Sequence, residues 1–149
     1  MSVTAAAGFV ASGVVAGLKT SGKPDVALVV NTGPAFAAAG VLTGNRVKAA
    51  PVVWTQQVLV DGLLRAVILN SGGANACTGP AGFNDSVRTA ADTAALVGCR
   101  PDEVAVCSTG LIGERLPMAK LLDGVFAAHA QLSADGGSAA ADAIMTTDT

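Results

Sequence analysis

The stretch RAVILN, residues 65–70, is a short apolar run that leads directly into SGGANACTGP, a stretch of small residues from 71 to 80. A continuous apolar run of this length, bounded by turn-forming residues, is typical of a buried β-strand. The same pattern returns in EVAVCS, residues 103–108, which leads into TGLIG, and in DVALVVN, residues 25–31. These runs predict a sheet in which two strands end in loops of small residues.

Other segments extend this predicted sheet. Residues 8–19 alternate loosely and indicate an early strand with glycine breaks, and residues 37–42 indicate another strand. Residues 50–60 are ambiguous, because Val52, Val53 and Trp54 favour a strand whereas residues 56–59 could form a helical turn.

Three helices are expected among the strands. Asn84 or Asp85 can cap the first by accepting hydrogen bonds from its free N–H groups, and Gly98 is a natural end for it. Pro117 fits the first position of a second helix, and Ser138 can cap a third. This order of strands, loops and helices indicates an α/β or α+β class. We expect α/β, with a layered sheet covered by helices and residues 1–149 forming one domain or part of one.

The composition excludes several classes of protein. Of the 149 residues, 51% are hydrophobic and 13% are charged, which is too apolar for a disordered chain. The net charge is −2 without a basic stripe, so nucleic acid is not expected as a partner. No apolar run approaches the roughly 18 residues that span a bilayer, and the start of the chain, MSVT, lacks the basic residues of a signal peptide. We therefore expect a cytoplasmic protein with no membrane partner.

The cysteines Cys77, Cys99 and Cys107 are odd in number and lack CxxC spacing, which argues against a disulfide framework or a zinc site. We expect them to be small buried hydrophobic side chains. The acidic residues are scattered rather than clustered, so no metal is expected.

The two small-residue loops are the best candidates for chemistry. Ligands of layered sheets bind where strands end, and glycines let a substrate approach backbone N–H groups. Such N–H groups, with a hydroxyl beside them, can stabilise an oxyanion, and Thr109-Gly110 after the strand 103–108 offers both. Ordinary glycine turns remain the structural alternative for both loops.

A nucleophile is harder to find. No phosphate-binding glycine motif is present, and the single histidine, His129, falls within a predicted amphipathic helix as a surface or boundary residue. Cys107 lies inside an apolar run, where burial would keep its thiol protonated and inert. Arg115 and Lys120 flank the second loop and could meet a carboxylate, although solvated surface charges are the simpler interpretation. The residues alone thus predict an incomplete active site.

Three long motifs, in this order, carry a resemblance to a known family. They are residues 70–79 (NSGGANACTG), 107–118 (CSTGLIGERLPM) and 143–149 (AIMTTDT). Together they resemble the bifunctional glutamate N-acetyltransferase / ornithine acetyltransferase family of arginine biosynthesis, and its actinobacterial members most. Phe9 with Gly13 and the stretch of residues 40–43 also fit, so the resemblance covers essentially the whole chain.

The resemblance implies a self-processing enzyme. A precursor cuts itself before a threonine into an α and a β chain, which usually assemble as α2β2, and that threonine is the nucleophile. It accepts acetyl from N2-acetylornithine and passes it to glutamate without a cofactor; acetyl-CoA is a further possible donor. The family's oxyanion hole falls on Thr109 and Gly110. A substrate-contacting threonine falls on the last motif, with Thr147 preferred over Thr146.

The resemblance also implies that more chain follows. The family's α chain continues beyond the last motif, so we interpret residues 1–149 as the N-terminal portion of an α chain, without the rest of α and without β. Such a chain is expected to expose an apolar patch and to associate. The alternatives are a related self-processing acyl-transfer enzyme or aminopeptidase, or a non-catalytic domain.

Overall fold

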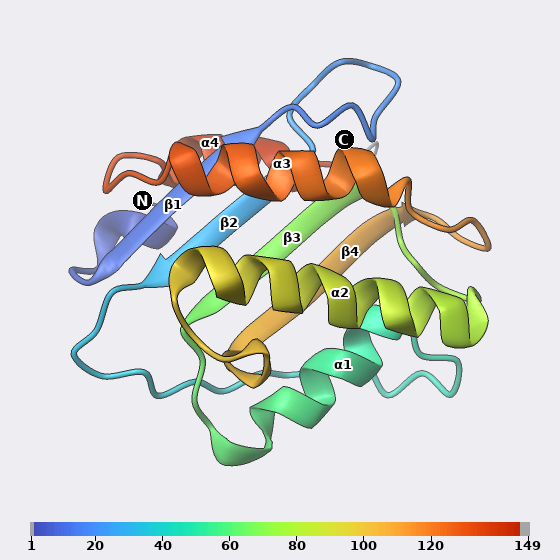
Figure 1. Ribbon diagram of the computed structural model, residues 1–149, viewed down its shortest axis with the longest axis horizontal. Helices are drawn as coiled ribbons and strands as arrows, with labels where there is room; N and C mark the ends of the chain where they lie inside the picture. The colour runs from blue at the N-terminus through green and yellow to red at the C-terminus, as the bar shows by residue number, and fades with distance from the viewer. Residues whose placement is uncertain (1, 147–149) are drawn as a thin grey trace.

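The computed structural model of the protein describes residues 2–146, and its strands form one four-stranded sheet within that range. β2 runs antiparallel to both β1 and β3, whereas β4 runs parallel to β3. β1, β3 and β4 therefore all end at the same end of the sheet, where the chain enters β2. The strands lie side by side in chain order (Figure 1): β1 (Phe9–Val14), β2 (Val26–Asn31), β3 (Ala66–Gly73) and β4 (Val104–Leu111).

Helices cover the sheet unequally on its two faces. Two helices lie across one face, a third runs beside β4, and the fourth lies behind the sheet (Figure 1). This arrangement confirms the expected α/β class with a helix-covered sheet. None of the helices described is both long and apolar enough to cross a membrane. The elements are η1 (Val3–Ala5), α1 (Ala50–Val58), η2 (Leu59–Asp61), α2 (Gly79–Val97), η3 (Pro101–Glu103), α3 (Met118–Ala130) and α4 (Gly137–Ala143).

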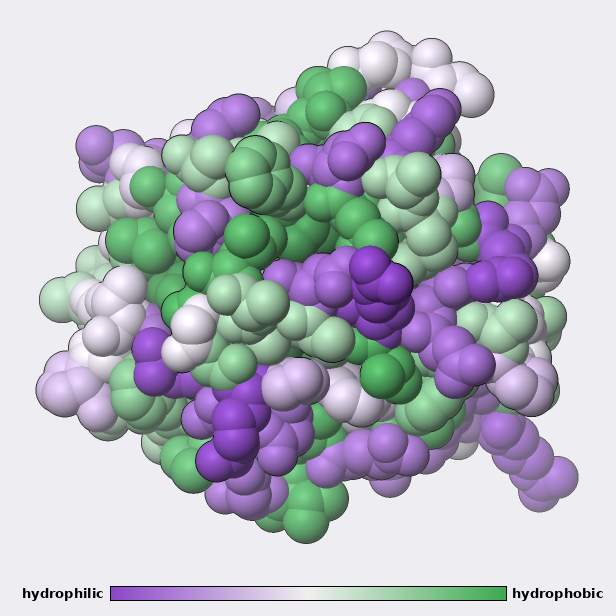
Figure 2. Space-filling view, in the orientation of Figure 1, coloured by the Kyte–Doolittle hydropathy of each residue, from purple (hydrophilic) through white to green (hydrophobic). Residues whose placement is uncertain are grey.

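The main core lies between the sheet and the helices α2 and α3. Leu28 and Ile68 are register partners on adjacent strands, and both are at most 1% exposed. Leu121 and Val125 of α3 pack into the same cluster, as their spacing predicts. The solvent-facing side of α2 and α3 is not fully polar. Hydrophobic residues gather over α3 in Figure 2, and Phe126 is 65% exposed.

The opposite face of the sheet is only partly covered. Ala140 and Ala143 of α4 pack against Ala27, which makes a small cluster of alanines. Beside α4 lies a groove of about 670 Å³ whose floor includes Val29 and Leu69, both partly buried. The side chains of β3 on this face are therefore less enclosed than those that face α2 and α3.

α1 covers the outer edge of β4, and its side chains bond to backbone groups that a neighbouring strand would otherwise bond. The Thr55 hydroxyl donates to the Val106 carbonyl at 2.8 Å and accepts from the Val106 N–H at 3.0 Å. The Trp54 indole N–H donates to the Val104 carbonyl at 2.9 Å. The helix thus satisfies backbone groups that an exposed edge strand would leave open. It also resolves the ambiguity of residues 50–60, where Pro51 in the first turn begins a helix.

Several predicted elements need correction. The strand expected at residues 37–42 does not form, and only Ala37 makes a bridge, to Leu63. Val41 in that segment is fully exposed, and apart from this bridge the segment joins no strand of the sheet. Both glycine loops begin later than expected, because β3 continues through Gly73 and β4 through Leu111.

The helix starts also differ from the prediction. Asn84 and Asp85 lie inside α2, which begins at Gly79 because Pro80 is accommodated in its first turn. Ser138 lies inside α4 rather than capping it. Pro117 precedes α3 by one residue, a small difference for a helix end. The predicted end of α2 at Gly98, with φ +75°, is confirmed.

Candidate functional site

The residues predicted to carry chemistry meet at the shared end of β3 and β4. Because these strands are parallel and in register, Ser71 lies beside Thr109, and Gly72 lies beside Gly110. The loops that follow are also joined, since the Ala74 N–H donates to the Leu111 carbonyl at 2.8 Å. The structure therefore brings the first two motifs together, although 38 residues separate them in the chain.

Gly110 occupies a position that only glycine fits. Its φ of +128° lies in a region that side chains rarely adopt. A Cβ there would lie 2.6 Å from the carbonyl carbon of Gly72 and 2.7 Å from the Gly73 nitrogen. These are backbone atoms of the paired strand and cannot move aside as a side chain would. The two strands thus approach each other closely at the candidate site.

The alternation of β4 fixes the direction of the Gly110 amide. Both backbone groups of Val106 bond with Thr55 on the outer edge, whereas the Leu111 carbonyl accepts from Ala74 on the β3 side. Successive residues of a strand direct their backbone groups to opposite sides. Gly110, four residues after Val106, therefore directs its N–H toward the outer edge of β4.

Thr109 places a hydroxyl beside that amide. Its side chain is partly exposed, and within residues 2–146 its hydroxyl has no hydrogen-bond partner. Ser108, the residue before Thr109, has a different role: its hydroxyl donates to the Asn70 side-chain oxygen at 2.6 Å. Asn70 in turn donates to the Gly73 carbonyl at 3.0 Å. The Ser108 hydrogen bond thus links the ends of β3 and β4, whereas the Thr109 hydroxyl has no partner among residues 2–146.

The third motif also reaches this end of the sheet. The hydroxyl of Ser71, the register partner of Thr109, donates to the Ala143 carbonyl at the end of α4. Thr146 follows three residues later and is half-buried. Thr147, the preferred substrate contact, lies outside the described residues. The structure therefore brings the segment that leads to both threonines close to the Thr109 strand.

Arg115 is not the free surface charge expected from the sequence. Its guanidinium makes two hydrogen bonds to Asp85, at 2.7 and 2.9 Å, and the Asp85 side chain is 8% exposed. This bonding raises the pKa of the Arg115 guanidinium. The pair ties the loop after β4 to α2. Lys120 is exposed, as expected, and its ammonium lies 3.3 Å from the Gly17 carbonyl.

The expected burial of the cysteines is wrong for two of them. Cys77 and Cys107 are exposed, and Cys99 is intermediate; all three are free thiols. Cys107 follows Val106 on β4, so its side chain points to the face opposite α2 and α3. Desolvation by its surroundings still raises the pKa of the Cys107 thiol, which keeps it a poor nucleophile.

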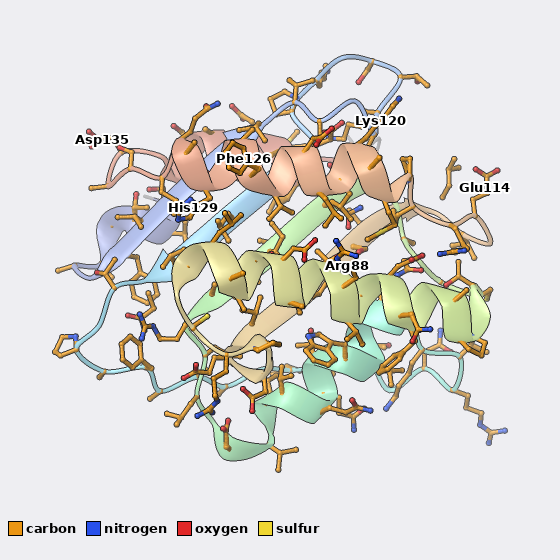
Figure 3. The ribbon with its side chains drawn as sticks, in the orientation of Figure 1. Arg88, Glu114, Lys120, Phe126, His129 and Asp135 are labelled. Carbon is orange, nitrogen blue, oxygen red and sulfur yellow. The ribbon has the colours of Figure 1, made fainter. Side chains whose placement is uncertain are left out.

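The remaining titratable groups do not complete a catalytic set. His129 lies on α3 at the end farthest from the loop that carries Glu114 (Figure 3) and is partly buried, as expected for a boundary residue. Among the described residues, no three His, Cys, Asp or Glu side chains gather where they could bind a metal. Among residues 2–146, no activated nucleophile therefore accompanies Thr109 and Gly110.

Comparisons with known proteins agree with the resemblance carried by the three motifs. The model of the ArgJ family matches residues 10–149. The chain belongs to the ArgJ family. It is 66% identical over 149 residues to the arginine biosynthesis bifunctional protein ArgJ of Streptomyces coelicolor, and 63% identical over 153 residues to that of Mycobacterium tuberculosis. It covers 39% and 38% of these relatives, so it spans about two fifths of their length.

Two solved structures of the family resemble the fold closely. Ornithine acetyltransferase of Mycobacterium tuberculosis, complexed with ornithine, matches with a TM-score of 0.98 and 62% identity, over 99% of this chain and 80% of that chain. The ArgJ protein of Bacillus halodurans matches with a TM-score of 0.91 and 41% identity, over 100% of this chain and 78% of that chain. The fold of this chain is thus shared with the matched parts of these two structures.

Sequence reasoning missed two groups at this site. Asp85 was expected as a helix cap, although its place one turn after Pro80 already argued for the helix interior. Lys19 was given no role, yet its ammonium donates to the Met145 carbonyl, one residue before Thr146. No local pattern reveals this contact, because the two residues are 126 positions apart.

Proposed function

We propose that this chain is the N-terminal part of the α chain of an acetyltransferase that moves acetyl from N2-acetylornithine to glutamate in arginine biosynthesis. The β chain of the same precursor would supply the nucleophilic threonine, in an α2β2 assembly. The chain itself would supply the oxyanion hole and part of the substrate site. The cytoplasmic location expected from the sequence and a role for acetyl-CoA as donor stay predictions.

The lengths of the relatives support the division into two chains. The present chain covers 80% of the polypeptide in the Mycobacterium tuberculosis structure but only 38% of the curated relative from that species. The polypeptide in the crystal structure is therefore about half as long as that relative, which is what cleavage of a precursor would produce.

The observation that carries the proposal is the position of Thr109 and Gly110. The Thr109 hydroxyl is free of partners within the described chain, and the adjacent Gly110 N–H is directed to the outer edge of β4. Both donors lie on a strand whose end is held by Gly72 and by the Ser108–Asn70 hydrogen bond. Donors fixed in this way can stabilise a developing oxyanion without reorganising during the reaction.

The chemistry needs such donors twice. The threonine hydroxyl attacks the acetyl carbonyl of N2-acetylornithine, and when the C–N bond breaks the ornithine amine leaves with a proton. The glutamate amine then attacks the acetyl ester, and breaking the C–O bond returns the threonine hydroxyl. Each attack forms a tetrahedral oxyanion, so both half-reactions would use Thr109 and Gly110. The self-cleavage also attacks a carbonyl and would use the same hole. Thr147 and Thr146 would contact the substrate.

The test is Thr109→Ala in the full-length precursor, with Thr109→Ser as the variant that keeps the hydroxyl. Acetyl transfer from N2-acetylornithine to glutamate should fall about 10²- to 10³-fold in Thr109→Ala, because one oxyanion donor is lost. Thr109→Ser should retain most of the activity. Thr20→Ala, on an exposed turn residue, is the control and should match the wild type. An unchanged rate and unchanged self-cleavage in Thr109→Ala would exclude the assigned role.

A donor screen separates this function from its alternatives. The wild-type precursor should use N2-acetylornithine and leave unmodified peptides intact. Peptide hydrolysis without acetyl transfer would instead favour an aminopeptidase. Neither activity, in a folded and processed protein, would favour a non-catalytic role.

A further inference from the structure

The segment after α4 is held at the sheet by two side chains from distant parts of the chain. The Ser71 hydroxyl donates to the Ala143 carbonyl, and the Lys19 ammonium donates to the Met145 carbonyl at 2.5 Å. These carbonyls lie on either side of Ile144, the first at the last residue of α4 and the second just beyond it. Free carbonyls at a helix C-terminus accept such donors, and a cation is favoured there.

Lys19 makes hydrogen bonds through both its backbone and its side chain. Its ammonium also donates to the Pro24 carbonyl at 2.9 Å, so it bridges the turn of residues 19–24 and the segment after α4. Its backbone N–H donates to the Asp25 carboxylate at 2.9 Å. A lysine held at both its backbone and its ammonium loses less freedom when it binds a further carbonyl.

Asp25 organises the whole turn. Its side chain is completely buried and accepts hydrogen bonds from the N–H groups of Ala16, Leu18 and Lys19, at 2.6, 2.6 and 2.9 Å. Its own carbonyl accepts from the Ser71 N–H at 2.8 Å. Both side chains that hold the segment after α4 are thus anchored through one residue at the start of β2.

This turn is packed directly against the candidate site. A Cβ at Gly72, the register partner of Gly110, would lie 3.0 Å from the backbone of Leu18. The turn of residues 16–19, the glycine ends of β3 and β4, and the segment after α4 therefore meet in one place. Lys19 connects the first of these to the last.

We infer that Lys19 is a positioning residue that holds residues 144–146, and with them the proposed substrate contact Thr146, at the ends of β3 and β4. The inference rests on the proposed function for its catalytic consequence. Lys19 acts through the Met145 carbonyl and does not touch the reacting atoms. Because Thr146 would contact the substrate in both the ground state and the transition state, loosening residues 144–146 weakens binding of substrate and transition state alike.

The experiment compares Lys19→Met, Lys19→Arg and Lys23→Met in the full-length precursor. Lys23 is the matched control, since it lies in the same turn with an exposed side chain. KM and kcat for N2-acetylornithine are measured for each variant, together with hydrogen exchange at residues 144–146. The exchange measurement reports the position of the segment without relying on activity.

Lys19→Met should raise KM about fivefold, as expected for one charged hydrogen bond at a partly exposed site, with kcat changed less than about twofold. Exchange at residues 144–146 should become faster. Lys19→Arg keeps a cationic donor and should restore both values partly, whereas Lys23→Met should match the wild type.

An unchanged KM, a fall in kcat with KM unchanged, or unchanged exchange in Lys19→Met would each overturn the inference. An equal effect of Lys23→Met would also overturn it, because a general loss of positive charge would then suffice. If the wild-type precursor transfers no acetyl group, the proposed function fails. The exchange result still decides whether Lys19 holds the segment.

Discussion

The central parts of β3 and β4, here called their bodies, and the C-terminal ends of the same strands are built from different residues. Along the bodies, Ile68, Val104 and Val106 are buried in the main core, and their bulk decides where the sheet lies. At the ends, Gly72 and Gly110 replace bulk with close backbone approach, and Thr109 beside them is partly exposed. The bodies stabilise the fold, whereas the ends position the donors proposed for catalysis.

This difference predicts that substitutions in the two regions fail in different ways. A change in the body should lower the free energy of unfolding and leave the chemistry of each folded molecule intact. A change at the ends should remove activity with a smaller effect on unfolding. Each prediction below tests one side of this division.

Gly110→Ala should have the largest effect. The new Cβ would lie 2.6 Å from the Gly72 backbone and would force the strand ends apart, which displaces both proposed oxyanion donors. Acetyl transfer by the full-length precursor should fall by about 10³-fold or more. Self-cleavage, followed by gel electrophoresis, should slow as well.

Gly113→Ala provides the matched control for this change. Gly113 also has a positive φ, of +89°, but a Cβ there meets no atom within 4 Å in the described structure. Both variants therefore carry backbone strain, and only Gly110→Ala carries the clash. Equal losses of activity in the two variants would show that strain, rather than the close approach of β3 and β4, is responsible.

Ile68→Ala tests the body of β3. Ile68 is 1% exposed in the main core, so its truncation should lower the free energy of unfolding by about 2–5 kcal/mol. Val67→Ala, on the less enclosed face of the same strand, should cost less. Urea denaturation measures both, and KM of the folded fraction should stay at the wild-type value. A change in KM for Ile68→Ala would show that body and ends are coupled.

Arg115→Ala and Arg88→Ala compare two Arg–Asp pairs, each with its Asp on α2. Arg115 pairs with the nearly buried Asp85, whereas Arg88 pairs with Asp92, whose side chain is 36% exposed. Removing Arg115 leaves the nearly buried Asp85 carboxylate without its partner and should lower the free energy of unfolding more than removing Arg88 does. Removing Arg88 should cost less than about 0.5 kcal/mol. Equal costs in denaturation experiments would contradict this difference.

The same division explains what the sequence could predict. The bodies of β2, β3 and β4 could be predicted from apolar runs such as RAVILN, because branched apolar side chains of this kind are favoured in buried strands. The ends were predicted as loops, because local patterns cannot show that Gly72 and Gly110 pair across 38 residues. Similarly, Asp85 and Lys19 obtain their partners only when distant segments pack together. The pairing of Thr109 with Ser71 of the first motif was not predicted, because it too joins segments that are distant in the chain.

Cys107 should show the smallest effect, and it lies where body and end meet. Burial raises the pKa of its thiol above the ordinary value, although the residue is exposed on the less covered face. Only the thiolate reacts with iodoacetamide, so a raised pKa leaves less reactive sulfur at pH 8 than in the unfolded chain. Alkylation of Cys107, followed by peptide mass spectrometry, should therefore be slower in the folded protein than in urea at pH 8, and its rate should still be rising at pH 9. If the pH midpoint of Cys107 alkylation in the folded protein were at or below that in the unfolded chain, this end of β4 would be solvated like a free strand end. The boundary between body and end would then fall at Val106 rather than after Cys107.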